Sequence, residues 1–537
     1  MPVIRLFYDD LEALTGVSIE RIKARLPLMC ADVERTDAEY MDVEFFPNRP
    51  DLFSVEGVSR ALKQFLELEP GLNTYTVEKS GIEMVVDPSV LEVRPYIVCG
   101  VVRHLQFDSM VIESLMLLQE HLHRGMGRNR EKVSVGVHDL ARVKPPFKYL
   151  AVDPSFSFVP LDYAEEMSMT EILERHPKGI GYRYILEGRA KYPVIIDSEG
   201  KTVSFPPIIN AERTKVTEST TDIFIEVTGL NENVSLALNI IACALAERGG
   251  RIQSVMVRLP GSLNETPCLE PRAVEIAHKD VNSLIGIDLS VEECKKCCAQ
   301  MGLGAEAKPE GMLEVRIPAY RYDILHTWDI IEDIAIGYGY DRLKPEIPGT
   351  MLIGKAHPIE EKNSTLREIM MGLGYFEVLT FTLTSERRQF EWMQREKRAV
   401  VEVASPISSE HTMLRCCILP NLLELLSLNK HRDLPQRIFE VGPVVLELKE
   451  NYRLAGVSTH ANANFAEVKS VVDAVLNEQG LEDAEVVESK DEAFLIGRRA
   501  DILMDGTPIG VFGEVHPGVI TKFGLRYPVV GFEMNVL

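Results

Sequence analysis

The chain of 537 residues contains nine cysteines and two tryptophans, and it lacks any long hydrophobic run. So few cysteines in so long a chain do not form a disulfide framework, and an intracellular compartment fits best. The longest apolar run, 234–245, is interrupted by Ser235 and Asn239 and is too short to span a bilayer. The N-terminal MPVIRLFYDD has acids where a secretory signal needs an apolar core. We therefore expect a cytoplasmic protein that does not associate with a membrane.

Positive charge is also scarce, because 58 basic residues face 81 acidic residues and give a formal net charge of −23. A chain that binds a polyanion across most of its surface is expected to be basic. If nucleic acid is a partner, a local basic patch or a second chain therefore has to supply the phosphate contacts.

The motifs of several common enzyme classes are absent. The sequence contains no G-x-x-x-x-G-K-[ST] phosphate loop, no G-x-G-x-x-G after a strand, no H-E-x-x-H and no G-x-S-x-G. These absences remove the usual nucleotide-loop, zinc-protease and serine-hydrolase interpretations.

A cysteine cluster resembles a metal motif at first sight. Cys294, Cys297 and Cys298 are spaced i, i+3 and i+4 on a predicted helix that follows the capping box in LSVEE. The nearest other cysteine, Cys268, lies 26 residues upstream, and no histidine stands at zinc-finger spacing. We favour core packing over zinc ligation for these thiols.

The chain is too long for one hydrophobic core, so we predict an α+β protein of several domains. Turn-rich joins divide it into a mixed α/β N-terminal block, a second block of helices and strands, a small winged-helix-like block and a C-terminal block of helices and strands. The predicted boundaries are 1–85, 86–265, 266–343 and 344–537.

Polar residues on the predicted strand DIFIEVTG are candidates for a site. Glu226 and Thr228 share one face of this strand, opposite Ile223, Ile225 and Val227. With Asn210 and Thr217, a short distance upstream, they could line a polar pocket. The alternative is an exposed sheet face.

Two further segments have both a chemical and a structural interpretation. His138 and Asp139 in GVHDL could form a general base pair, although a turn is favoured. The basic tract HLHRGMGRNREK, 121–132, could contact RNA phosphate, although a solvated helix terminus is favoured.

The segment 318–343, PAYRYDILHTWDIIEDIAIGYGYDRL, predicts an amphipathic helix whose polar face is entirely acidic. Asp329, Glu332 and Asp333 fall within about 100° of one another. Like charges at i, i+4 destabilise a helix by a few tenths of a kcal/mol. A divalent cation, a basic partner surface or solvent alone are the candidates that balance this charge.

A fourth acid, Asp323, precedes Asp329 by six residues, which is about 9 Å along a helix axis. Two carboxylates so far apart are poorly placed to touch one Mg²⁺ at about 2.1 Å. We therefore predict that Asp323 is the N-cap of the acidic helix, and that any Mg²⁺ is bound through water or completed by another chain.

Five ordered segments together resemble one family over essentially the whole chain. They are NRPDLFSVEGVSRAL, SFPPIIN with DIFIEVTG, the acidic segment 318–343, LRCCILPNLLELLSLN with RIFEVGPVV, and GEVHPGVITKFGL. The chain resembles the β subunit of phenylalanyl-tRNA synthetase in its short, archaeal and eukaryotic-like form.

The resemblance implies a complex of two α and two β chains that attaches phenylalanine to tRNA(Phe) with ATP and Mg²⁺. It implies that ATP is bound mainly by the α subunit, and that the C-terminal block is a class II synthetase-like antiparallel sheet domain that no longer catalyses. The second block would be a B3/B4-like editing domain that hydrolyses Tyr-tRNA(Phe), and the third a B5 domain.

The resemblance also implies roles for residues. Glu226 and Thr228 match the acid and the threonine of the editing strand, and His138 matches a family histidine. The acids matching those associated with Mg²⁺, at a site shared with the α chain, are Asp323, Asp329, Glu332 and Asp333. The alternatives are a non-catalytic scaffold subunit and a nucleic-acid-binding protein without editing activity.

Overall fold

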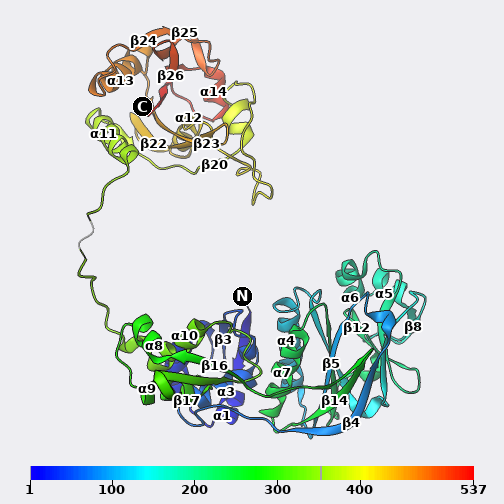
Figure 1. The fold of residues 1–537 in the computed structure, drawn as a ribbon. Coiled ribbons are helices and arrows are strands. Elements are labelled where there is room, and N and C mark those ends of the chain that lie inside the picture. The colour runs from blue at the N-terminus through cyan, green and yellow to red at the C-terminus, as the bar shows by residue number, and fades with distance from the viewer. Residues whose placement is uncertain (1, 351–352, 537) are drawn as a thin grey trace. The chain divides into compact units, whose positions relative to one another are not determined.

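The structure is a computed structural model that describes residues 2–350 and 353–536. The chain divides into two compact units, Met1–Ile347 and Pro348–Leu537. Both units mix helices with sheets, so the expected mixed α/β character is confirmed (Figure 1). In the described residues, no helix combines the length and the apolarity needed to cross a bilayer.

The first unit begins with a three-stranded sheet of order β1-β3-β2. Its helix α3, Val55–Phe65, starts at Ser54, whose hydroxyl accepts a hydrogen bond from the Gly57 amide, and is buried on nearly every side. The other elements are β1 (Val3–Phe7), α1 (Tyr8–Thr15), α2 (Ile19–Arg25), β2 (Ala31–Thr36) and β3 (Tyr40–Phe45).

A ten-stranded sheet follows. Nine of its strands have the order β12-β11-β10-β7-β4-β14-β5-β13-β6, and the tenth, β15, pairs with β14. Helices α4 (Ser109–Arg124) and α7 (Asn233–Ala246) pack in the core on one side of it (Figure 1). Its strands are β4 (Val77–Val86), β5 (Tyr96–Arg103), β6 (Val133–Asp139), β7 (Phe147–Val152), β10 (Tyr192–Ile196), β11 (Thr202–Phe205), β12 (Ile209–Asn210), β13 (Ile223–Gly229), β14 (Arg251–Leu259) and β15 (Ser262–Thr266).

Strand β13 lies between β5 and β6, and every one of its residues is buried. Ile223, Ile225 and Val227 pack in the same core as α4 and α7, whereas Phe224 packs in the core on the opposite face. The predicted two faces of this strand are therefore confirmed. The alternative of an exposed sheet face is wrong, because both neighbouring strands and both cores cover β13.

A smaller sheet of order β16-β18-β17 ends the first unit. The predicted capping box of Ser290 and Glu293 is present at the start of α9, and all three cysteines of α9 are buried. Core packing of these thiols is confirmed. The elements are β16 (Arg272–Ala277), α8 (His278–Ile285), α9 (Val291–Gln300), β17 (Gly304–Lys308), β18 (Met312–Ile317) and α10 (Thr327–Tyr338).

The second unit is built on a sheet of order β19-β22-β23-β27-β26-β25-β24, antiparallel except where β19 pairs with β22. One core contains α11 (Pro358–Gly372) and α13 (Phe465–Glu478); a second contains α12 (Leu419–Leu428) and α14 (Pro517–Lys522). The strands are β19 (Phe376–Glu377), β22 (Gln436–Leu446), β23 (Lys449–Thr459), β24 (Glu485–Glu488), β25 (Phe494–Met504), β26 (Thr507–Val515) and β27 (Val529–Asn535).

Candidate functional site

A cavity of about 380 Å³ lies beside β13 in the first unit. Its walls come from α4, β6, β11, β12 and β13 and from the loops between them. Two of the predicted site residues, Glu226 and Asn210, line this cavity, together with Ser204. Ser204, which lies on β11 and is the first residue of the SFPPIIN segment, was not singled out from the sequence.

Glu226 places a carboxyl group at the floor of the cavity. Its Oε1 accepts a 2.9 Å hydrogen bond from the Ser204 hydroxyl and lies 3.8 Å from Nε2 of His138. Its Oε2 is buried and has no hydrogen-bond partner in the described part of the chain. A buried carboxyl oxygen left unpaired costs free energy, so this atom is suited to accept a hydrogen bond from a bound molecule.

Gly136 makes room for this carboxyl group. It pairs with Glu226 across the β6–β13 ladder, and a Cβ at this position would lie 2.3 Å from Oε1 of Glu226 and 2.9 Å from Nε2 of His138. A glycine inside a strand pattern often marks such a close approach, so Gly136 was the feature of the sequence that could have indicated a site here.

His138 does not pair with Asp139. The two are consecutive in β6, and His138 Nδ1 lies 2.9 Å from the Thr214 hydroxyl, while its Nε2 has no hydrogen-bond partner among the described residues. Asp139 instead accepts from the Ala141 amide and the Thr220 hydroxyl. The favoured turn is wrong for His138, which lies within strand β6, whereas Asp139 caps the short helical turn that follows it.

Thr228 and Thr217 are not among the residues lining the cavity. The Thr228 hydroxyl accepts a 2.9 Å hydrogen bond from Nε of Arg94, whose remaining donors go to backbone carbonyl groups. Burial lowers the pKa of Arg94 to about 10. Thr217 pairs with the Ser219 hydroxyl. The structure therefore places Glu226 and Asn210 in the cavity lining and His138 3.8 Å from Glu226 outside that lining, and it places the two threonines elsewhere.

The basic tract 121–132 is partly internal. His123 is buried, and its Nε2 accepts a hydrogen bond from the Val135 amide; burial, above all, lowers its pKa to about 4. Arg130 is also buried and forms an ion pair with Glu120. A solvated helix terminus is therefore wrong for these two residues, although Arg124 and Arg128 are exposed.

The acidic segment differs from its predicted arrangement. Helix α10 is capped by His326, with Asp329 completing a capping box by accepting from the amides of His326 and Leu325. Asp323 as the N-cap is wrong, because both of its carboxyl oxygens accept from Arg321, at 2.8 and 2.6 Å.

Arg321 balances two of the four acids from within the chain. It also donates to Asp333 at 2.7 Å, and the side chains of Arg321 and Asp333 are almost fully buried. Burial raises the pKa of Asp333, and the neighbouring arginine opposes that rise. Only Glu332 and part of Asp329 face outward, so the acidic face is not uniformly solvated. An internal arginine was missing from the candidates that the sequence suggested.

These four acids do not fit one shared Mg²⁺ site in the described residues. Two of them already bind a guanidinium group, and a third caps the helix with one oxygen. Within residues 2–350 and 353–536, the acids gathered closely enough to hold one ion are a different, largely exposed group: Asp32, Glu34 and Glu44. The Mg²⁺ assignment of the α10 acids stays a prediction that depends on the resemblance.

In the second unit, a buried ion pair and a helix occupy one face of the sheet. Arg415 forms an ion pair with Glu440 at 2.7 Å and donates a hydrogen bond to the Thr380 hydroxyl, and both ionic side chains are almost fully buried. Helix α12 packs against the same face through apolar side chains, including Leu419 and Leu422. Apolar and ion-paired side chains therefore fill this part of the sheet face, whereas a substrate cleft would need open, polar space there.

Comparison with known proteins places the chain in a class. Family models match along most of its length: a tRNA synthetase B5 domain at 274–340, a B3/4 domain at 126–256, and a phenylalanyl tRNA synthetase β chain CLM domain at 343–536. Strand β13 and most of the cavity lining lie within the B3/4 match, whereas the part of the lining from α4 precedes it; α10 lies within the B5 match. These matches define a component of an aminoacyl-tRNA synthetase.

Whole-chain relatives give the particular family. Phenylalanine–tRNA ligase β subunits from Methanosarcina barkeri and Archaeoglobus fulgidus are 54% and 52% identical over all of this chain and 99% and 98% of their own. An N-terminal fragment of the Pyrococcus horikoshii β subunit matches with a TM-score of 0.61 and 38% identity, covering 63% of this chain and 99% of the fragment. The chain belongs to the phenylalanine–tRNA ligase β-subunit family.

Proposed function

We propose that this chain works with an α subunit to attach phenylalanine to tRNA(Phe), and that its β13 cavity hydrolyses tyrosine wrongly attached to that tRNA. The observation that carries the editing proposal is the buried Glu226 Oε2, which has no partner in the described residues and belongs to a residue that lines the cavity. A tyrosine phenol can donate to this oxygen, whereas phenylalanine leaves it unpaired.

The physical need for such a site follows from the limits of an apolar pocket. A pocket for phenylalanine rejects an added hydroxyl only weakly, whereas a site that hydrogen-bonds the hydroxyl rejects the analogue lacking it far more strongly. Glu226 would orient the phenol, with Ser204 and the space left by Gly136 holding the carboxyl group in place. Arg130, Lys178 and Lys215 also line the cavity, where they form ion pairs with Glu120 and Asp162 of the same lining.

The editing proposal is tested in the α–β complex by deacylation of Tyr-tRNA(Phe). Glu226→Ala should slow it roughly 10- to 100-fold, because a hydrogen bond to a carboxylate contributes about 1.5–3 kcal/mol. The matched control is Glu165→Ala, an exposed acid in the same part of the chain. Phenylalanine activation should be unchanged in both variants. Unaltered deacylation in Glu226→Ala would remove the assignment.

The α subunit would cover an apolar surface in the second unit. Phe376, Leu379 and Phe381 are 73%, 88% and 79% exposed within six residues, next to the edge of the sheet at β19. So large an exposed apolar group beside a sheet edge is typical of an interface. Leu379→Ser with Phe381→Ser should abolish co-purification with the α subunit, while Leu448→Ser, equally exposed elsewhere, should not. An intact complex in the double variant would exclude this surface.

ATP and Mg²⁺ would be bound mainly by the α subunit. The proposal is supported by the packing of Arg415, Glu440 and α12 in the described residues, which fills the part of the sheet face that they cover. Amino-acid-dependent pyrophosphate exchange should therefore require the α subunit. Exchange by this chain alone, free of partners, would contradict it.

A further inference from the structure

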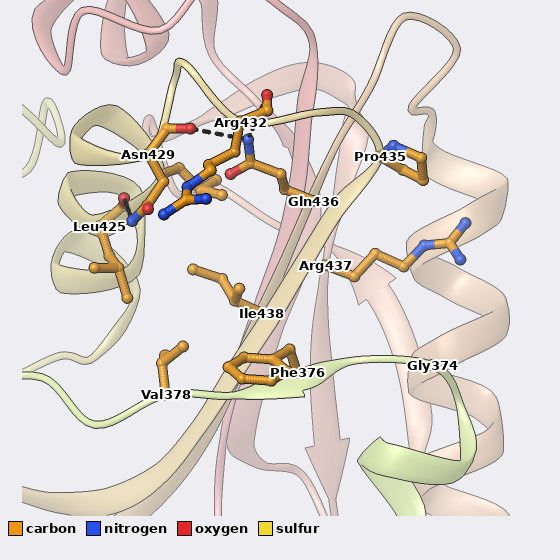
Figure 2. A pocket seen from close by; sticks show the side chains of 11 residues that line it. Gly374, Phe376, Val378, Leu425, Asn429, Arg432, Pro435, Gln436, Arg437 and Ile438 are labelled. Atoms are coloured by element: carbon orange, nitrogen blue, oxygen red, sulfur yellow. Dashed lines mark hydrogen bonds between the residues drawn. The ribbon is translucent and has the colours of Figure 1, made fainter.

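Two adjoining hollows lie at the C-terminal end of α12 in the second unit. Their volumes are about 440 and 520 Å³, and they share Leu426, Arg432 and Gln436. Figure 2 shows the first hollow, in which Phe376, Val378 and Ile438 form an apolar wall below Arg432. The second continues from Arg432 to Tyr527.

The charge of this surface is opposite to that of the chain. Among the residues lining the two hollows are four arginines or lysines and one acid, Asp433, although acids outnumber bases in the whole sequence. Lys430, Arg432 and Arg526 are exposed and form no ion pair with the described residues. Free cations concentrated on one concave surface attract a polyanion despite a negative net charge.

The loop 429–436, which carries Lys430 and Arg432, is held by hydrogen bonds. The Arg432 amide donates to the Asn429 carbonyl at 2.9 Å, and the Gln436 side chain donates to the carbonyl groups of Asn429 and Arg432 (Figure 2). The backbone is therefore held while the basic side chains remain free. A braced loop loses less conformational freedom when its cations bind a partner.

An aromatic ring accompanies the cations. Tyr527, which is 49% exposed, lines the second hollow together with Arg526. Cationic grooves with exposed aromatic faces bind nucleic-acid strands, because phosphates pair with the cations and bases stack on the rings. An acidic protein segment would use the cations but would gain less from the rings.

We propose that the surface formed by Lys430, Arg432, Arg526 and Tyr527 binds the phosphate backbone of tRNA. This inference rests on the proposed partnership with tRNA(Phe), but it is independent of the editing cavity, which lies in the other unit. It also answers how a chain with a charge of −23 contributes to binding a polyanion.

The test compares two triple variants of the α–β complex that remove the same charge. The first is Lys430→Gln, Arg432→Gln and Arg526→Gln; the control changes three other cations of the same unit that are exposed and unpaired in the described residues: Lys355, Lys449 and Lys490. Binding of a tRNA(Phe) transcript is measured by fluorescence anisotropy between 50 and 200 mM salt.

Each phosphate contact contributes about 0.7 to 0.9 to the slope of log affinity against log salt, so the first variant should lower that slope by about 2 to 3. The loss of affinity across this salt range should then shrink by roughly 15- to 60-fold, while the control keeps the original slope. Equal slopes in both variants would overturn the proposal. Loss of the α subunit on sedimentation, without a change in slope, would assign the surface to a protein interface and would overturn it as well.

Discussion

The ion pairs of Arg321 give a prediction whose magnitude follows from the structure. In Arg321→Met the buried Asp333 loses its cation, and at pH 7 it can avoid an unpaired buried charge by binding a proton. Moving an ordinary aspartate from its pKa near 3.9 to pH 7 limits that cost to about 4 kcal/mol. Removing one partner of a buried ion pair costs about 3–5 kcal/mol in general, so the two figures agree.

The pH dependence is the diagnostic part of this prediction. If proton uptake by Asp333 sets the cost, the difference in unfolding free energy between wild type and Arg321→Met should fall by about 1.4 kcal/mol for each pH unit from 7 to 5. Adding Asp333→Asn to Arg321→Met should recover much of the loss, because the buried group is then neutral. Asp333→Asn alone should destabilise the chain, since it leaves the guanidinium with fewer carboxylates.

The assay uses the two tryptophans. Trp328 lies in α10, and Trp392 lies in the second unit. In a Trp392→Phe background, the fluorescence of Trp328 therefore reports unfolding of the first unit by guanidinium chloride. Each variant is measured with 5 mM MgCl₂ and with EDTA. Equal stabilities of wild type and Arg321→Met would refute the reasoning. A chelator effect on the wild type as large as that of the substitution would show that a cation, and not Arg321, balances these acids.

Three further predictions concern the β13 region. Gly136→Ala should slow Tyr-tRNA(Phe) deacylation at least tenfold, because the new Cβ would overlap the Glu226 carboxyl group, while Gly181→Ala, which has open space, should leave the rate unchanged. The unfolded state binds a proton at His123 near pH 6.5 and the folded state only near pH 4, so stability should fall by up to about 3 kcal/mol as pH drops through this window. In His123→Gln, thermal unfolding should lose that part of the pH dependence; an unchanged profile would exclude it. Thr228→Val should lower stability by about 1–2 kcal/mol in chemical unfolding, because a buried guanidinium loses an acceptor, yet leave deacylation intact. A slower deacylation rate in Thr228→Val would show that Thr228 contributes to the editing site after all.

The sequence alone determined the features that depend on neighbours along the chain. The alternation in DIFIEVTG gives the two faces of β13, and LSVEE gives the capping box of α9. These structures form through hydrogen bonds and side-chain periodicity within a few residues, so their signals are local. Family membership was also visible, because five motifs occurred in order.

Only the tertiary structure decided which of these residues meet. His138 and Glu226 approach each other across β6 and β13 although 88 positions separate them, and Thr228 is turned to Arg94 and away from the cavity. The acidic segment showed its charge in the sequence, but the arginine that pairs with it is selected by how the loop before α10 folds back. Helix periodicity gives a side chain its direction; the surrounding packing gives it a partner, and that packing depends on contacts between distant segments.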